Sequence, residues 1–178
     1  MTATAVPDRI RRAVGSLDVR PDDRLLEIGC GGGVVVALIC PLLTTGVIAA
    51  VDRSATARAV RRNEAAVTEG RAVIATTAFT EPGLRATGLT ARRYDKIFAI
   101  NVNLFWTGPA TAELALAAKL LISSGSLYAF YDPPPGRLDE VAAKTTAAFE
   151  TAGFRTDVRH VPPVVCVRGH GLRMRSER

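Results

Sequence analysis

Short apolar runs alternate along the chain with longer segments in which apolar residues recur at helical spacing. Several of the short runs, such as VIAAV and SLYAFY, are almost wholly apolar, as is typical of parallel strands covered on both faces. Strands are predicted at 24–28, 47–51, 72–76, 94–100, 125–131, 156–161 and 164–168. Alanine-rich segments predict helices at 56–70, 109–121 and 137–153. The alternation predicts an α/β fold with a doubly wound sheet.

Glycine and proline mark the expected ends of these elements. Gly108 and Pro109 predict the start of one helix, and helix ends are predicted at Gly70, Gly125 and Gly153. Strands 156–161 and 164–168 are separated by only two prolines, which is too short for a crossover helix. These two strands are therefore expected to be antiparallel. Ligands of such sheets bind beyond the carboxyl ends of the strands, so the residues that follow each strand are the candidates for a site.

Size and composition predict a single domain over residues 1–178, with a helical segment within 1–22 and a basic tail at 171–178. The chain has 178 residues and is 48% hydrophobic, enough for one continuous core. It has no apolar stretch of membrane-spanning length and no signal-peptide pattern, which predicts a cytoplasmic protein without membrane association. The three cysteines share no C-x-x-C spacing, so we expect reduced thiols and neither a disulfide framework nor a zinc site.

The charge balance leaves two interpretations open. The net charge is +6 and the isoelectric point is about 9.8, which suits an anionic partner such as nucleic acid. The arginines, however, occur in small groups along the chain, such as Arg61-Arg62 and Arg92-Arg93, rather than in one block. Such groups are also typical of solvated surfaces.

The most specific motif is the glycine-rich stretch in RLLEIGCGGGVVVAL, residues 24–38. A phosphate-binding P-loop would need Gly-Lys-Ser/Thr at its end, where this chain has valines, and a G-x-G-x-x-G dinucleotide motif would need glycine at Val34. The pattern that fits is acidic-x-Gly-x-Gly-x-Gly, formed by Glu27, Gly29, Gly31 and Gly33. A carboxylate at the end of a buried strand needs a cationic or polar partner, and the ammonium group of an amino acid would serve.

The segment LEIGCGGG resembles the first motif of class I S-adenosylmethionine-dependent methyltransferases. The likeness extends through VIAAVDRS, YDKIFAINVNLFW and AGFRTDVRHVPPVVCVRG, and covers roughly residues 22 to 170. It implies a Rossmann-like seven-stranded sheet whose last strand is antiparallel, with S-adenosyl-L-methionine as the cofactor. The cofactor-binding residues implied are Glu27, Gly29, Cys30, Gly31, Gly33, Asp52, Arg53, Thr77, Ala78 and Asn101.

The resemblance also implies individual roles. Asp52 would accept hydrogen bonds from both ribose hydroxyls, although an N-cap for a helix starting near Ser54 is an alternative role. Cys30 would contribute its backbone rather than its thiol. Members of the family often carry an acidic residue after the third strand that binds the adenine amino group, whereas this chain reads IATTAFTEPG. The adenine contact would then come from Thr77 or from the backbone at Ala78 and Phe79.

The methyl acceptor is less constrained by the sequence. The segment NVNLFW after the fourth strand lacks the Asn/Asp-Pro-Pro-aromatic motif of methyltransferases that act on nucleobase amines, while Phe105 and Trp106 could line an acceptor pocket. Tyr131 and Asp132, at the end of the fifth strand, are the candidate catalytic residues for contacting the acceptor or removing its proton. No Asp/His cluster has the spacing of a magnesium site, so no metal is expected.

These observations predict an enzyme that transfers a methyl group from S-adenosyl-L-methionine to a small organic acceptor. RNA is the second candidate acceptor, because the net charge is positive and no long insertion after strands four or five would close the cleft. A third hypothesis is a scaffold subunit that binds the cofactor without catalysis. The sequence leaves a homo-oligomer open.

Overall fold

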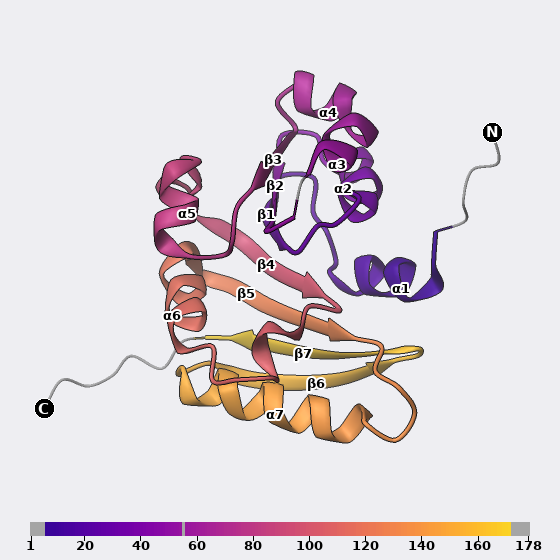
Figure 1. Ribbon diagram of the computed structural model, residues 1–178, viewed down its shortest axis with the longest axis vertical. Helices are drawn as coiled ribbons and strands as arrows, with labels where there is room; N and C mark the ends of the chain where they lie inside the picture. Colours follow the sequence, from indigo (N-terminus) through magenta and orange to yellow (C-terminus); the bar gives the residue numbers. More distant parts are fainter. Residues whose placement is uncertain (1–5, 55, 172–178) are drawn as a thin grey trace, which may run out of the picture.

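One seven-stranded sheet organises the protein, which a computed structural model describes over residues 6–54 and 56–171 (Figure 1). All seven predicted strands are present. The sheet order is β3-β2-β1-β4-β5-β7-β6, and β7 runs antiparallel to both of its neighbours while the remaining pairs are parallel. The predicted doubly wound Rossmann-like sheet and its terminal hairpin are thus confirmed. The strands are β1 (Arg24–Ile28), β2 (Val47–Asp52), β3 (Ala72–Thr76), β4 (Tyr94–Ile100), β5 (Leu121–Tyr131), β6 (Arg155–Val161) and β7 (Val164–His170).

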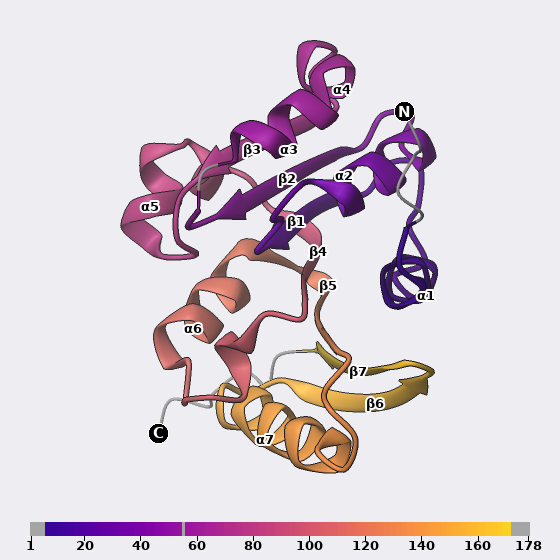
Figure 2. The same ribbon diagram turned by 45° about the vertical axis from the view of Figure 1, so that its right-hand side comes forward.

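Helices cover both faces of the sheet (Figures 1 and 2). One face carries α1 (Asp8–Ser16), α2 (Val34–Ile39), α3 (Ala57–Arg62) and α4 (Glu64–Thr68), and the other carries α5 (Glu81–Ala86), α6 (Thr111–Leu120) and α7 (Leu138–Thr151). Three 3-10 turns, η1 (Cys40–Leu42), η2 (Leu89–Ala91) and η3 (Asn103–Phe105), complete the connections. No helix in the described part of the chain is both long and apolar enough to cross a membrane.

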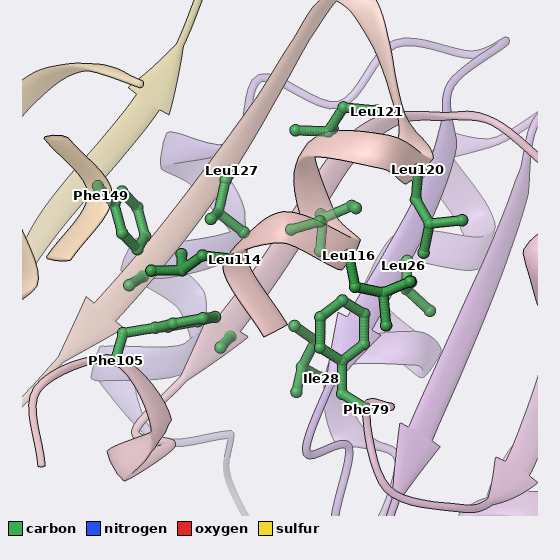
Figure 3. Packing of buried hydrophobic residues seen from close by; sticks show 14 of the residues in the cluster. Leu26, Ile28, Phe79, Phe105, Leu114, Leu116, Leu120, Leu121, Leu127 and Phe149 are labelled. Carbon is green, nitrogen blue, oxygen red and sulfur yellow. The ribbon is translucent and has the colours of Figure 1, made fainter. Parts of the chain in front are cut away.

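Each face of the sheet has its own apolar core, because side chains alternate along every strand. Leu26 and Ile28 of β1 pack toward α6, together with Leu127 of β5 (Figure 3). Phe105 and Phe149 close this cluster near α7, with ring centroids 5.4 Å apart in an edge-to-face arrangement. The opposite face buries a second cluster beneath the helices α1 to α4. A doubly covered sheet of this kind leaves mainly the ends of the strands free for ligands.

The helix predicted at 56–70 is wrong in one respect, because it is divided into α3 and α4 at Asn63. Asn63 is buried, and its side-chain amide donates to the carbonyl oxygens of Gly33 at 2.9 Å and Ala59 at 2.8 Å. The side chain thus bonds to the helix backbone and to the glycine loop at the point where the helix is interrupted. A periodicity of apolar residues does not show such a side-chain bond.

Two further boundaries differ from the prediction. Strand β5 begins at Leu121 directly after α6, so Gly125 lies inside the strand rather than at the end of a helix. The sequence also gave no prediction for α5, which starts behind Thr80, whose hydroxyl accepts a hydrogen bond from the Gly83 amide at 3.3 Å. A threonine followed by Glu81 and Pro82 is a recognisable start signal for a short helix.

Both chain ends of the domain prediction are only partly covered by the structure. The predicted helical segment within 1–22 contains α1, which packs through Ala13, Val14 and Leu17 against the second core cluster. Of the predicted basic tail 171–178, all but Gly171 lies outside the described residues.

Candidate functional site

The glycine loop after β1 adopts a conformation that favours glycine at three positions. Gly29, Gly31 and Gly33 have φ angles of +79°, +48° and +71°. A Cβ at Gly33 would lie 2.8 Å from the Cβ of Ala59, so no side chain fits there. A Cβ at Gly31 would meet nothing within 4 Å, which leaves open space beside the middle of the loop. The loop therefore packs closely against α3 at its end while its centre stays accessible.

Asp52 at the end of β2 is bonded to this loop. One carboxylate oxygen accepts a hydrogen bond from the Gly31 amide and the other accepts from the Ser54 amide, each at 2.8 Å. The next helix, α3, begins at Ala57, and its N-cap residue is Thr56. The Asp52 carboxylate therefore binds the Ser54 amide in the connecting loop and does not cap a helix. Each of its oxygens retains lone pairs for a further donor.

Glu27 carries a buried carboxyl group with one oxygen atom unpartnered among the described residues. Its side chain is 2% exposed, and its Oε2 atom has no hydrogen bond to any residue that the structure describes. Burial, with a smaller contribution from Asp52, raises the pKa of Glu27 to about 8. Such an unpaired buried oxygen is costly and calls for a donor or a cation from outside the protein.

Cys30 lies in the same loop but does not supply a reactive thiolate. Burial, with smaller contributions from Glu27 and Asp52, raises the pKa of its thiol to about 12. Its backbone amide donates to Val51 at 3.1 Å, and its carbonyl accepts from Gly33 at 2.8 Å. The residue therefore holds the loop together through its main chain.

A cleft of about 820 Å³ opens at the carboxyl ends of β1, β2 and β4. We call it the main cleft. Six of the predicted cofactor residues line it, namely Gly29, Asp52, Arg53, Thr77, Ala78 and Asn101. The other four do not line the cleft itself: Glu27 lies in β1, and Cys30, Gly31 and Gly33 belong to the adjoining loop. Phe79 lines the cleft and also belongs to the apolar core.

A second cavity of about 360 Å³ lies past the end of β5, and we call it the β5 pocket. It shares Asn101 and Asn103 with the main cleft, so the two cavities adjoin at the end of β4. Both candidate catalytic residues, Tyr131 and Asp132, line the β5 pocket, together with Trp106. The structure therefore brings the predicted cofactor side and the predicted acceptor side into contact.

Asn101 connects the ends of β4 and β5. It has a φ angle of +54°, which is uncommon for a residue other than glycine. Its backbone amide donates to Phe130 at 2.8 Å, and its side-chain oxygen accepts from the Asp132 amide at 2.7 Å. These bonds hold the residue at the boundary between the two cavities despite its strained backbone.

The two candidate catalytic residues differ in environment. Burial raises the pKa of Tyr131 to about 12, so its hydroxyl stays protonated at neutral pH, and it lies beside Thr145 without forming a hydrogen bond of good geometry. Asp132 is exposed. A carboxylate rather than a phenolate is therefore the group able to accept a proton at this end of the cleft.

Sequence reasoning missed two polar residues of the β5 pocket, Asn103 and Arg137. Asn103 follows β4 within the NVNLFW segment and could have been found from its place after a strand. Arg137 directly precedes α7 and follows the segment that contains Tyr131 and Asp132. No motif marks an arginine at this position. Within residues 6–54 and 56–171, no three His, Cys, Asp or Glu side chains gather closely enough to hold a metal ion.

We compared the chain with known protein families, curated proteins and solved structures. No protein-family model matches the chain, and no curated protein matches its sequence. Solved structures do match, among them the 1,6-didemethyltoxoflavin-N1-methyltransferase of Burkholderia thailandensis with bound S-adenosylhomocysteine. The TM-score is 0.70 at 18% identity, over 93% of this chain and 79% of that one. The chain has the class I methyltransferase fold.

Other structures with this methyltransferase fold act on different molecules. A precorrin-6y C5,15-methyltransferase from Geobacter metallireducens matches with a TM-score of 0.68 at 18% identity, over 96% of this chain and 94% of that one. Fibrillarin, a pre-rRNA processing protein of Methanococcus jannaschii, matches with a TM-score of 0.68 at 15% identity, over 94% and 76%. At such low identity the likeness establishes the fold, and the acceptor has to be argued from the site.

Proposed function

We propose that this protein is an S-adenosyl-L-methionine-dependent methyltransferase that acts on a small organic acceptor. The observation that carries the proposal is the unpartnered buried carboxyl group of Glu27 beneath a glycine loop whose centre is open at Gly31. This combination fits the ammonium and carboxylate of a methionine moiety, because Glu27 lacks a donor and the loop exposes main-chain groups.

The remaining cofactor contacts would come from residues that line the main cleft. Both carboxylate oxygens of Asp52 have spare lone pairs for the two ribose hydroxyls, and Arg53 lies next to them. Thr77, Ala78 and Phe79 would surround the adenine, with the phenylalanine ring offering an apolar surface. No acidic side chain is needed for this, since main-chain groups can bind the adenine amino group.

When bound, the cofactor supplies a methyl group whose bond to sulfur breaks with the electron pair passing to sulfur, while the acceptor's lone pair forms the new bond. Positioning and exclusion of water account for most of the acceleration in such a displacement. Asn101, which lines both cavities, would help to position the acceptor in the β5 pocket next to the cofactor in the main cleft. Asp132 would accept a proton from the acceptor where one is released, and Tyr131 would remain a protonated hydrogen-bond donor.

The experiment that tests the proposal is calorimetric titration with S-adenosylmethionine and S-adenosylhomocysteine, with NAD as the control ligand. We expect binding of the first two and none of NAD. Replacing Asp52 by alanine should weaken binding by roughly 1–3 kcal/mol, because charged hydrogen bonds to the ribose are lost.

The Asp22→Ala variant is the matched control, because this exposed aspartate precedes β1 at the opposite end of the strand. It should bind like the unmodified protein. Equal affinity of folded Asp52→Ala and unmodified protein would remove Asp52 from the cofactor site.

RNA is the second candidate acceptor, favoured by the net charge of +6 and by the similarity in fold to fibrillarin. A scaffold subunit that binds the cofactor without catalysis would show cofactor binding but no methyl transfer to any acceptor. The small acceptor is preferred because the cavity next to the main cleft is compact.

A further inference from the structure

We propose that the β5 pocket binds the methyl acceptor and that this acceptor is a small planar organic anion. The inference rests on the proposed function and adds a class of substrate to it. It starts from the polar groups that line the pocket and from the hydrogen bonds that those groups already make.

The two asparagines of the pocket present donors rather than acceptors. The side-chain oxygen of Asn101 accepts from the Asp132 amide at 2.7 Å, and that of Asn103 accepts from the Trp106 indole N–H at 3.2 Å. Neither side-chain NH₂ group has a partner among the residues described. Since each amide oxygen already accepts one bond inside the protein while each NH₂ group makes none to a described residue, the groups left for a ligand are mainly N–H donors.

Arg137 and Tyr131 add donors to the same pocket. The Arg137 guanidinium binds Glu140 through Nε and one terminal nitrogen, while its other terminal nitrogen has no bond to any described residue. Tyr131 is 3% exposed, and its buried hydroxyl is unpartnered within the described chain and keeps its proton. Among the described residues, Asp132 is the one carboxylate that lines the pocket, and its side chain is exposed. Donors therefore outnumber acceptors, which favours a ligand rich in acceptor oxygens.

The pocket is also flat-walled and small. The Arg137 guanidinium lies over the Trp106 ring at 5.1 Å from its centroid, and the Trp106 orientation is fixed by its bond to Asn103. Pro133 and Pro134 contribute further rigid surface. A volume of about 360 Å³ is near the lower end of the roughly 300–1,000 Å³ found for ligand pockets. It suits one ring system better than a polymer.

Trp106 is the only tryptophan in the chain, so its indole N–H gives a single NMR signal that reports on the pocket. We would titrate ¹⁵N-labelled protein with 4-hydroxybenzoate, with the neutral 4-hydroxybenzamide and with the cation tyramine. The acid should shift the Trp106 signal with at least ten-fold higher affinity than the amide or the amine. Equal or tighter binding of the amide or amine, or no shift with the acid at millimolar concentration, would overturn the inference.

Arg137 is tested by two substitutions. Arg137→Gln should abolish the difference between acid and amide, whereas Arg137→Lys should keep most of it by retaining the charge. Arg85→Gln is the matched control, since Arg85 is also exposed and paired with a glutamate, Glu81, but lies on α5. Unchanged selectivity in folded Arg137→Gln would contradict the assigned anion contact.

This measurement separates the two levels of the argument, because the indole signal does not depend on methyl transfer. If S-adenosylhomocysteine binds and the pocket does not prefer the acid, the inference fails while the proposed function stands. If S-adenosylhomocysteine does not bind, the proposed function fails.

Discussion

Glu27 shows how one residue combines a cost in stability with a site for a ligand. The carboxyl group lies between two apolar neighbours in the sheet register, Ala50 and Phe98, and has no partner for Oε2 within the described residues. Its pKa is raised from 4.5 to about 8, mainly because burial disfavours the charged form. The folded protein without ligand therefore holds a proton at neutral pH that the unfolded chain releases.

Because at neutral pH this proton is bound only in the folded state, the pH dependence of the free energy of unfolding has a predictable direction. Below pH 4.5 both states are protonated, and between pH 4.5 and 8 only the folded state is, so the free energy of unfolding falls as pH rises. The limiting slope is about 1.4 kcal/mol per pH unit. In Glu27→Gln this carboxyl group is absent, so its free energy of unfolding should not fall in this way. In urea unfolding, the free energy of unfolding of the variant should rise by a few kcal/mol relative to that of the unmodified protein between pH 4.5 and 8.

A suitable control for that experiment is Glu64→Gln, since Glu64 is exposed on α4. Its pH profile should follow the unmodified protein. Parallel profiles of the unmodified protein and Glu27→Gln would show that Glu27 is ionised in the folded state.

At the scale of elements, the break between α3 and α4 supports the glycine loop. The Asn63 side chain binds the carbonyl oxygens of Gly33 and Ala59, and a Cβ at Gly33 would collide with Ala59. The helix pair is therefore both bonded to the loop and closely packed against it. This arrangement places the loop amides next to Asp52.

Asn63→Ala should leave two buried carbonyl groups without this donor. Both carbonyl groups keep a backbone donor, from Ala37 and from Asn63 itself. We expect a loss of about 2 kcal/mol in the free energy of unfolding, since each of the two lost hydrogen bonds contributes roughly 0.5–1.5 kcal/mol. Urea unfolding measures it, with Glu64→Ala at the exposed neighbouring position as the control. A loss no larger than that of the control would mean that water replaces the asparagine amide without cost.

The elements themselves were largely predictable. Runs such as VIAAV and KIFAI mark buried strands because burial on both faces requires an unbroken apolar stretch, and the short Pro162-Pro163 link can only join antiparallel neighbours. The break at Asn63 and the early start of β5 were not predictable, because they depend on bonds to residues that are remote in the sequence.

At the scale of the whole molecule, the positive charge is spread rather than concentrated. Exposed arginine pairs lie on α3, before β4 and along β6, namely Arg61 and Arg62, Arg92 and Arg93, and Arg155 and Arg159. Arg92 and Arg93 precede β4, at the end of the strand opposite the main cleft, and β6 is the strand at the edge of the sheet. The net charge of +6 therefore supports weak attraction to polyanions more than a shaped RNA site.

This distribution predicts how the protein behaves toward RNA. Retention on immobilised RNA at 50 mM salt should be lost by about 200 mM, because contacts limited to phosphates weaken steeply with salt. RNA should also receive no methyl group from the cofactor. Retention at 200 mM salt together with methylated RNA would favour the RNA candidate over the small acceptor.

The sequence by itself determined the strands, the closing hairpin and the glycine loop with its acidic flank, because each depends on residues that are neighbours along the chain. It also placed Asp52, Asn101, Tyr131 and Asp132 at strand ends, which a parallel sheet brings to one edge.

The tertiary structure alone decided which of these groups have partners. The burial of Glu27 without a donor, the use of the Asn101 oxygen by a residue 31 positions away and the stacking of Arg137 on Trp106 all come from segments that meet only in the folded protein. Burial and hydrogen bonding are properties of the surroundings in space, and they determine which chemistry remains available to a ligand.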